Sequence, residues 1–159
     1  MNRKKDTAVT AGQTQAPADY PYPQLLLKNQ LCFPLYACAR KITNAYTPFL
    51  KPFGITYTQY IVLMVLWEEG TSTVGSLGAA LRLDSGTLTP LLKKLETAGY
   101  LTRSRSPEDE RVVTITPTDK GMALRDQLAV VPAQIGSCIS LKPEEASLLY
   151  GILYQILDT

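Results

Sequence analysis

The 159 residues suffice for one domain with a sizeable core, and 45% of them are hydrophobic, an ordinary share for a globular protein. The net charge of +2 does not by itself indicate a nucleic-acid partner, so any DNA affinity must come from local clusters of Arg and Lys. Histidine is absent, which excludes histidine-based general base catalysis and histidine metal sites. We expect neither a metal nor a cofactor.

The first 24 residues are rich in Thr, Ala, Gln and Pro and predict a flexible tail (1–24). They lack the apolar stretch of a secretory signal, and no apolar run approaches the roughly 20 residues of a membrane span. We therefore expect a cytoplasmic protein with no membrane partner. The remainder (25–159) is expected to form one folded domain.

Apolar residues recur at helical spacing from Leu25 to about Tyr46 and predict a first helix. Pro34 lies inside this run and is expected to kink it. Pro48, Pro52 and Gly54 then mark a break.

The next helix begins at a capping box, in which Thr56 and Gln59 each satisfy the other's backbone amide. Gly70 ends it, and a short helix follows Thr73. Asp84 then provides an N-cap for a further helix. The apolar side of that helix is spaced i, i+3, i+4, i+7: Leu88, Leu91, Leu92 and Leu95.

Two strands are predicted at 100–106 and 111–116, joined by a charged tip. A helix is expected to start with Thr116 as its cap and Pro117 in its first position, to run to about Val131 and to end at Pro132. A last helix opens at Pro143. The order of short helix, capped helix and hairpin is that of a winged helix-turn-helix, a mainly α fold with a small β-wing.

The helix after Asp84 is the candidate DNA reader. Ser85, Thr87 and Thr89 place small hydroxyls at its N-terminal end, where a recognition helix meets base edges. Lys93 and Lys94 lie further along and can reach the phosphate backbone. Taken alone, these residues equally fit an ordinary amphipathic helix with a solvated lysine pair.

The hairpin adds a second basic element. Arg103, Arg105 and Arg111 lie on or beside its two strands, and guanidiniums on a thin hairpin suit a minor groove. Asp109 is expected to hold the Arg111 guanidinium in a fork-shaped ion pair. A capped helix and a basic hairpin in this order favour binding to double-stranded DNA over a plain surface hairpin.

Two segments carry a family resemblance: Leu83-Asp84-Ser85-Gly86-Thr87-Leu88-Thr89-Pro90-Leu91-Leu92-Lys93-Lys94-Leu95-Glu96, and Gly99-Tyr100-Leu101-Thr102-Arg103 followed by Asp109-Glu110-Arg111. They resemble the MarR family, and more closely its OhrR-like branch of organic-peroxide-sensing repressors. The resemblance implies a homodimer on an inverted-repeat operator, with dimerisation helices at 25–50 and 117–159 and a DNA-binding lobe at 55–116.

The same branch has a peroxide-sensing cysteine in a Cys-Phe-x-Leu-Tyr context, which here matches Cys32-Phe33-Pro34-Leu35-Tyr36. The resemblance implies that Tyr46 and Tyr57 of the other chain hydrogen-bond the Cys32 thiolate, with Tyr36 one turn away in the same chain. Some members carry a second cysteine that forms a disulfide with the first. Cys138 is the candidate for that role, a small thiol from solution being the alternative, and Cys38 is expected to pack.

The chemistry of Cys32 agrees with this role, because a thiolate and not a thiol attacks hydroperoxides. Phenol donors favour the charged form of sulfur. Without the surrounding motif, Cys32 reads as a small buried hydrophobe.

Two alternatives remain open from the sequence. The repressor can instead be released by a small aromatic or phenolic ligand, in a pocket lined by Tyr46, Tyr57, Tyr60 and Trp67. In the other alternative the protein is a thiol peroxidase that uses Cys32, with Arg40 as a weak candidate for positioning the peroxide. We expect a regulator and not an enzyme, because a peroxidase leaves the winged helix without a purpose.

Overall fold

The computed structural model describes residues 20–105, 109, 111–137 and 139–158. Backbone contacts divide the chain into two units, Met1–Arg40 and Lys41–Thr159. The boundary falls within helix α1 (Cys32–Ala45), so the two parts of that helix are described with their own units.

In the first unit, two 3₁₀ turns precede α1: η1 (Pro23–Leu25) and η2 (Leu27–Asn29). Asn29 Nδ2 donates to the Pro23 carbonyl at 2.8 Å, and the Gln30 side-chain amide donates to the Gln24 carbonyl. The expected helix start at Leu25 and the expected kink at Pro34 were therefore wrong. Pro34 is the third residue of α1, where a backbone amide has no partner within the helix, so its missing donor is tolerated.

The second unit continues with α2 (Thr47–Leu50), the 3₁₀ turn η3 (Lys51–Phe53) and α3 (Tyr57–Glu69). The predicted capping box at the start of α3 is confirmed. The Thr56 amide donates to Gln59 Oε1 at 2.9 Å, and the Gln59 amide donates to Thr56 Oγ1 at 3.4 Å. Gly70 ends α3 with φ of 78°, a conformation that favours glycine.

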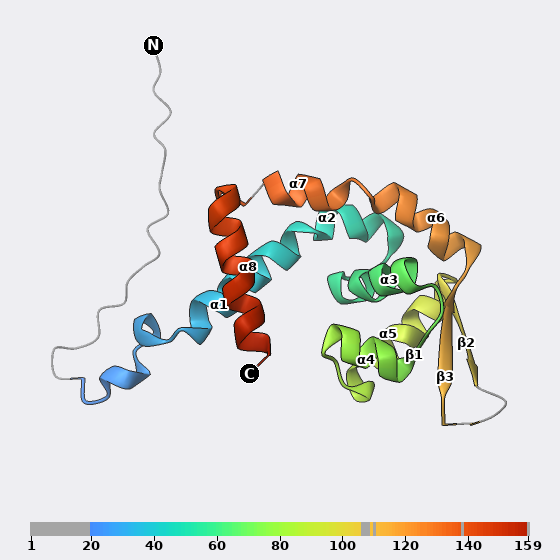
Figure 1. Ribbon diagram of the computed structural model, residues 1–159, viewed down its shortest axis with the longest axis horizontal. Coiled ribbons are helices and arrows are strands. Elements are labelled where there is room, and N and C mark those ends of the chain that lie inside the picture. Colours follow the sequence, from blue (N-terminus) through green and yellow to red (C-terminus); the bar gives the residue numbers. More distant parts are fainter. Residues whose placement is uncertain (1–19, 106–108, 110, 138, 159) are drawn as a thin grey trace, which may run out of the picture. The chain divides into compact units, whose positions relative to one another are not determined.

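Helices α4 (Val74–Leu81) and α5 (Ser85–Thr97) follow, and then the hairpin of β2 (Leu101–Arg105) and β3 (Val113–Pro117) (Figure 1). The strands form an antiparallel sheet in the order β1-β3-β2, with Arg103 opposite Ile115. The two-residue strand β1 (Ser72–Thr73) pairs with β3 and was missed from the sequence, since two residues show no periodicity.

The chain then forms α6 (Asp119–Leu128), α7 (Val131–Ser137) and α8 (Pro143–Leu157). The expected cap at Thr116 was wrong, because Pro117 pairs with Leu101 in the sheet. Thr118 caps α6 instead, with its hydroxyl accepting the Gly121 amide at 3.1 Å. Pro132 does not end a helix; it is the second residue of α7, where proline fits the first turn.

One hydrophobic core joins α3, α4, α5, α6 and the sheet. We call these four helices and the sheet together the reader lobe. Its fully buried side chains include Leu63, Leu66, Leu77, Leu88, Leu92, Leu95, Leu101, Ile115 and Leu124. Gly121 allows α6 to approach the strand, since a Cβ there would lie 2.0 Å from the Tyr100 carbonyl oxygen. The Gly121 carbonyl also accepts the Trp67 indole N–H at 2.8 Å.

No single helix in the described part of the chain is long and apolar enough to cross a membrane. Only a bent pair, Cys32–Phe53 with Tyr57–Glu69, reaches the needed length and composition together, across a bend of 77°.

Candidate DNA-reading face and redox site

The N-terminal end of α5 is fixed by Asp84. Its Oδ1 accepts the Thr87 amide at 2.8 Å, and its Oδ2 accepts the Thr87 hydroxyl at 2.8 Å. These two hydrogen bonds hold the pKa of Asp84 below its usual value. The predicted N-cap is confirmed, and it keeps the first turn of the candidate reader in one geometry.

The three hydroxyls predicted to meet DNA lie within the first five residues of α5 and are all exposed. Thr87 donates to Asp84, and Thr89 donates to the Ser85 carbonyl at 2.7 Å. The protons of both hydroxyls are therefore used within the chain and their lone pairs remain as acceptors, while Ser85 has no side-chain bond of this kind among the described contacts. The amide-less Pro90 lies inside the helix and leaves the Gly86 carbonyl without its usual partner from four residues on.

Further along α5, Lys93 and Lys94 are exposed. The buried side of the same helix consists of Leu88, Leu92 and Leu95. The predicted apolar stripe is thus in the core, apart from the half-buried Leu91, and the two lysines lie off it.

The hairpin arginines have different surroundings. Arg103 on β2 binds Glu96 of α5, with its Nε and Nη2 both 2.8 Å from Glu96 Oε2. Arg105 at the end of β2 is exposed. Arg103 therefore fixes the hairpin against the reader helix, whereas Arg105 extends from it.

The expected ion pair between Asp109 and the Arg111 guanidinium was wrong. Asp109 Oδ1 instead accepts the backbone amide of Arg111 at 2.9 Å, a turn typical of aspartate. The ion pairs formed by the described residues do not include Arg111, and its side chain is exposed.

In the first unit, Cys32 is the first residue of α1 and carries an exposed free thiol. One turn on, the Tyr36 hydroxyl accepts a hydrogen bond of 3.2 Å from Arg40, whose guanidinium lies 5.5 Å from the centre of the Tyr36 ring. Cys38 is also exposed, so its expected packing role is wrong for this chain alone.

In the second unit, Tyr46 and Tyr57 lie in contact, with ring centres 4.9 Å apart. Tyr60 joins them at 5.7 Å from Tyr46, and Trp67 lies 5.9 Å from Tyr60. Burial raises the pKa of Tyr46 and of Tyr57, and for Tyr57 the proximity of Tyr46 adds to the rise. The two phenols therefore stay protonated and can donate to an anion.

A cavity of about 470 Å³ lies beside this cluster. Tyr57, Leu50 and Ile55 contribute its apolar wall, and Thr47 and Lys51 are among its polar groups. Of the four aromatic residues expected to line a ligand pocket, Tyr57 lines this cavity, whereas Tyr46, Tyr60 and Trp67 are not among its lining residues, so that prediction was wrong for three of the four.

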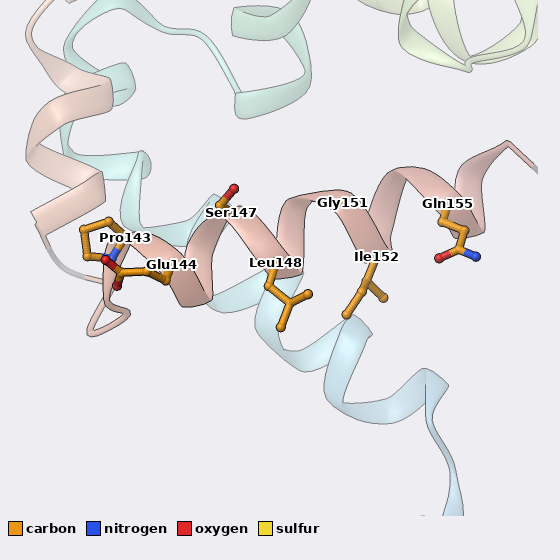
Figure 2. Close-up of a pocket in the computed structure, with 7 residues that line it drawn as sticks. All are labelled: Pro143, Glu144, Ser147, Leu148, Gly151, Ile152 and Gln155. Atoms are coloured by element: carbon orange, nitrogen blue, oxygen red, sulfur yellow. The ribbon is translucent and has the colours of Figure 1, made fainter.

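Helix α8 leaves apolar side chains exposed on several turns. Leu148 and Ile152 are 66% and 45% exposed and point to the same side of the helix (Figure 2). The first unit also has exposed apolar side chains, namely Leu25, Leu27, Leu31 and Phe33. Apolar surface of this extent indicates a protein interface.

Residues 44–128 match the family model described as Transcriptional regulator SarA/Rot. The organic hydroperoxide resistance transcriptional regulator of Bacillus subtilis is 44% identical over 138 residues, which are 87% of this chain and 94% of that protein. The chain belongs to the MarR family of transcriptional regulators, in its OhrR-like branch.

Solved structures of MarR-family members share the fold. AbfR of Staphylococcus epidermidis, reduced and bound to DNA, is 41% identical with a TM-score of 0.72, over 85% of this chain and 94% of that chain. Disulfide-formed AbfR is 44% identical with a TM-score of 0.59, over 85% and 92%. A mutant MarR from E. coli, complexed with operator DNA, is 25% identical with a TM-score of 0.71, over 80% and 93%.

Two features of this face were not predicted from the sequence. Glu96 as the partner of Arg103 needs the register of α5 against β2, which the sequence alone does not give. Pro90 lies inside α5, although proline usually interrupts a helix, so its place in the reader helix was not predicted. Cys138, the candidate second cysteine, lies outside the described residues.

Proposed function

We propose that this chain is a cytoplasmic, homodimeric transcriptional repressor that releases its operator when an organic hydroperoxide oxidises Cys32. One observation carries the proposal. An exposed thiol begins α1 in a chain that also holds a capped reader helix, and this chain is 44% identical to the hydroperoxide resistance regulator of Bacillus subtilis.

The DNA contacts follow from the reader lobe. The Asp84-capped end of α5 enters a major groove, with Ser85, Thr87 and Thr89 at the base edges and Lys93 and Lys94 at the phosphates. Arg105 and Arg111 reach the flanking minor groove, and Asp109 shapes the turn that presents Arg111. Arg103 does not contact DNA itself; it positions the hairpin by binding Glu96 of α5. The operator is an inverted repeat, since a two-fold dimer presents two equivalent readers.

The dimer uses the exposed apolar side chains of the first and last helices of the chain. In a second copy the same surfaces recur, so α8 and the Leu25–Phe33 region of two chains can cover each other. This arrangement also brings Cys32 of one protomer to Tyr46 and Tyr57 of its partner.

The redox step begins with the Cys32 thiolate. Its sulfur attacks one peroxide oxygen, an S–O bond forms, the O–O bond breaks and the alkoxide leaves as an alcohol after taking a proton. The protonated phenols of Tyr46 and Tyr57, with Tyr36 nearby, stabilise the thiolate beforehand. The sulfenic acid then condenses with a second thiol, releasing water and forming a disulfide; Cys138 or a small thiol supplies that sulfur.

A second candidate function is favoured by the cavity beside Tyr57. In this alternative a small aromatic or phenolic ligand occupies the cavity and releases the operator without any change at Cys32. The two functions differ in whether the cysteine is needed.

The test is a mobility shift on an inverted-repeat promoter fragment, with and without cumene hydroperoxide. The Cys32→Ser variant should keep the DNA at peroxide concentrations that release the parent protein. The matched control is Cys38→Ser, another exposed thiol of α1, which should respond like the parent. If Cys32→Ser is still released by peroxide, the redox function is wrong; non-reducing gels of the same samples identify the second thiol.

A further inference from the structure

Arg82 occupies the turn between α4 and α5, two residues before the Asp84 cap of the reader helix. Among the described residues, Arg82 alone has a positive φ without being glycine, with φ of 52° and ψ of 42°. An L residue other than Asn or Asp is unfavourable in this left-handed conformation, and such strain persists where the surroundings require it.

The turn itself is tight. The Leu83 amide donates to the Gly78 carbonyl at 2.9 Å, and a Cβ at Gly78 would lie 2.8 Å from the Leu83 carbonyl oxygen. A glycine or asparagine would adopt the Arg82 backbone conformation at lower cost. The backbone therefore does not explain an arginine at this position, and its side chain must be considered.

The Arg82 guanidinium binds the C-terminal end of α8, 75 residues further along the chain. Its Nη1 donates to the Leu157 carbonyl at 2.5 Å, and its Nη2 lies 2.7 Å from Asp158 Oδ1. The Leu157 carbonyl is one of the last in α8, where no amide of the helix can reach it. Arg82 thus closes the negative end of α8 while it shapes the turn before the reader.

We propose that Arg82 is a positioning residue that couples α8 to the reader helix, so that a movement of α8 changes how α5 is presented to DNA. The inference rests on the proposed function, in which α8 belongs to the dimer interface that oxidation reshapes. The pair is exposed, with 51% and 64% of the two side chains accessible, so it adds little to overall stability. Its effect is on geometry, because it joins two elements at defined atoms.

The first measurement needs no DNA. In the reduced, full-length dimer, hydrogen exchange is compared between the parent and Arg82→Asn, in which asparagine accepts the turn conformation but lacks the guanidinium. Exchange should rise roughly two- to fivefold both at the end of α8 and in the first turn of α5. Arg125→Asn is the control, since it removes an exposed arginine whose ion pair, among the described residues, is with its neighbour Asp126. If exchange at the end of α8 does not change in Arg82→Asn, the coupling is overturned.

The second measurement titrates hydroperoxide and follows Cys32 oxidation and operator release in the same samples. In the parent the two curves should coincide. In Arg82→Asn and in Asp158→Asn the concentration that releases DNA should exceed the one that oxidises Cys32 by about fivefold or more, the lower end of usual couplings between sites. Asp158→Asn shows that the effect is not a lost contact of Arg82 with DNA.

Coinciding curves in both variants would overturn the coupling and leave the proposed function intact. A parent protein that keeps its operator after Cys32 is oxidised would overturn the proposed function and the regulatory role of Arg82 with it. In that case the hydrogen-exchange measurement still tests whether Arg82 couples α8 to α5, because it depends on neither DNA binding nor oxidation.

Discussion

The reader lobe buries its large apolar side chains, whereas α8 leaves many of its own exposed. Leu63 and Leu88 in the lobe are fully buried, whereas Leu148 and Tyr150 on α8 are 66% and 63% exposed. Within the lobe, free backbone amides at the N-termini of α3 and α5 are hydrogen-bonded by the capping box at Thr56 and by the carboxylate of Asp84. The difference shows that one region is complete within a single chain, while the other has a surface that a second chain must cover.

The most severe disruption of the lobe is a cavity in its core. Leu88→Ala removes a fully buried side chain of α5 and should lower the free energy of unfolding by about 2–5 kcal/mol, measured by urea denaturation. The control is Leu91→Ala on the same helix, where the side chain is half-buried and the loss should be smaller. Equal losses from the two variants would show that α5 does not pack as described.

Helix α8 should respond differently, through association. Leu148→Glu combined with Ile152→Glu places two charges on the side of α8 shown in Figure 2 and should raise the dissociation constant of the dimer about 100-fold or more, since each apolar side chain contributes roughly 1.5–3 kcal/mol when buried. Sedimentation equilibrium measures this, with Ala80→Glu, at an exposed position of α4 in the reader lobe, as the control that adds a charge away from α8. A dimer of unchanged affinity would place the interface elsewhere.

The same contrast explains what the sequence could predict. The caps at Thr56 and Asp84 and the stripe of α5 are local patterns, in which neighbouring residues determine the geometry, so they were found. The N-terminal helix was misplaced because its apolar spacing continued across two 3₁₀ turns whose side chains are exposed. Periodicity indicates an apolar face but not whether the same chain buries it.

Contacts between distant segments were beyond the sequence for a different reason. The β1–β3 pairing, the Glu96–Arg103 pair and the Arg82 contact with Leu157 each join residues whose proximity depends on the packing of the whole lobe or on α8. The family resemblance predicted roles for Cys32, Tyr46 and Tyr57, but it gave no partner for Arg82. Contacts of this kind can be identified only from the three-dimensional structure.

The cap of α5 allows a finer test of the lobe, through pH. Because hydrogen bonds from Thr87 lower the pKa of Asp84 in the folded chain, its carboxylate stabilises the fold above the ordinary pKa of about 3.8, and this contribution is lost as pH falls through the lower folded value. Thermal unfolding of the parent should therefore lose stability, relative to Asp84→Asn, as pH falls below about 4, because asparagine caps without a titrating group. Parallel curves for the two proteins would contradict the lowered pKa.

The smallest effect separates the two arginines of β2. Arg105 is exposed, so Arg105→Ala should leave stability unchanged and reduce by about one the slope of log affinity against log salt for any duplex. Arg103 is partly buried against Glu96, so Arg103→Ala should lower the free energy of unfolding by up to about 1 kcal/mol and weaken DNA binding through a displaced hairpin. Glu96→Gln distinguishes the causes: it keeps both arginines, and if it weakens operator binding as Arg103→Ala does, the pair acts by positioning. If Glu96→Gln binds DNA normally while Arg103→Ala changes the salt slope, Arg103 contacts phosphate directly and the hairpin needs no anchor on α5.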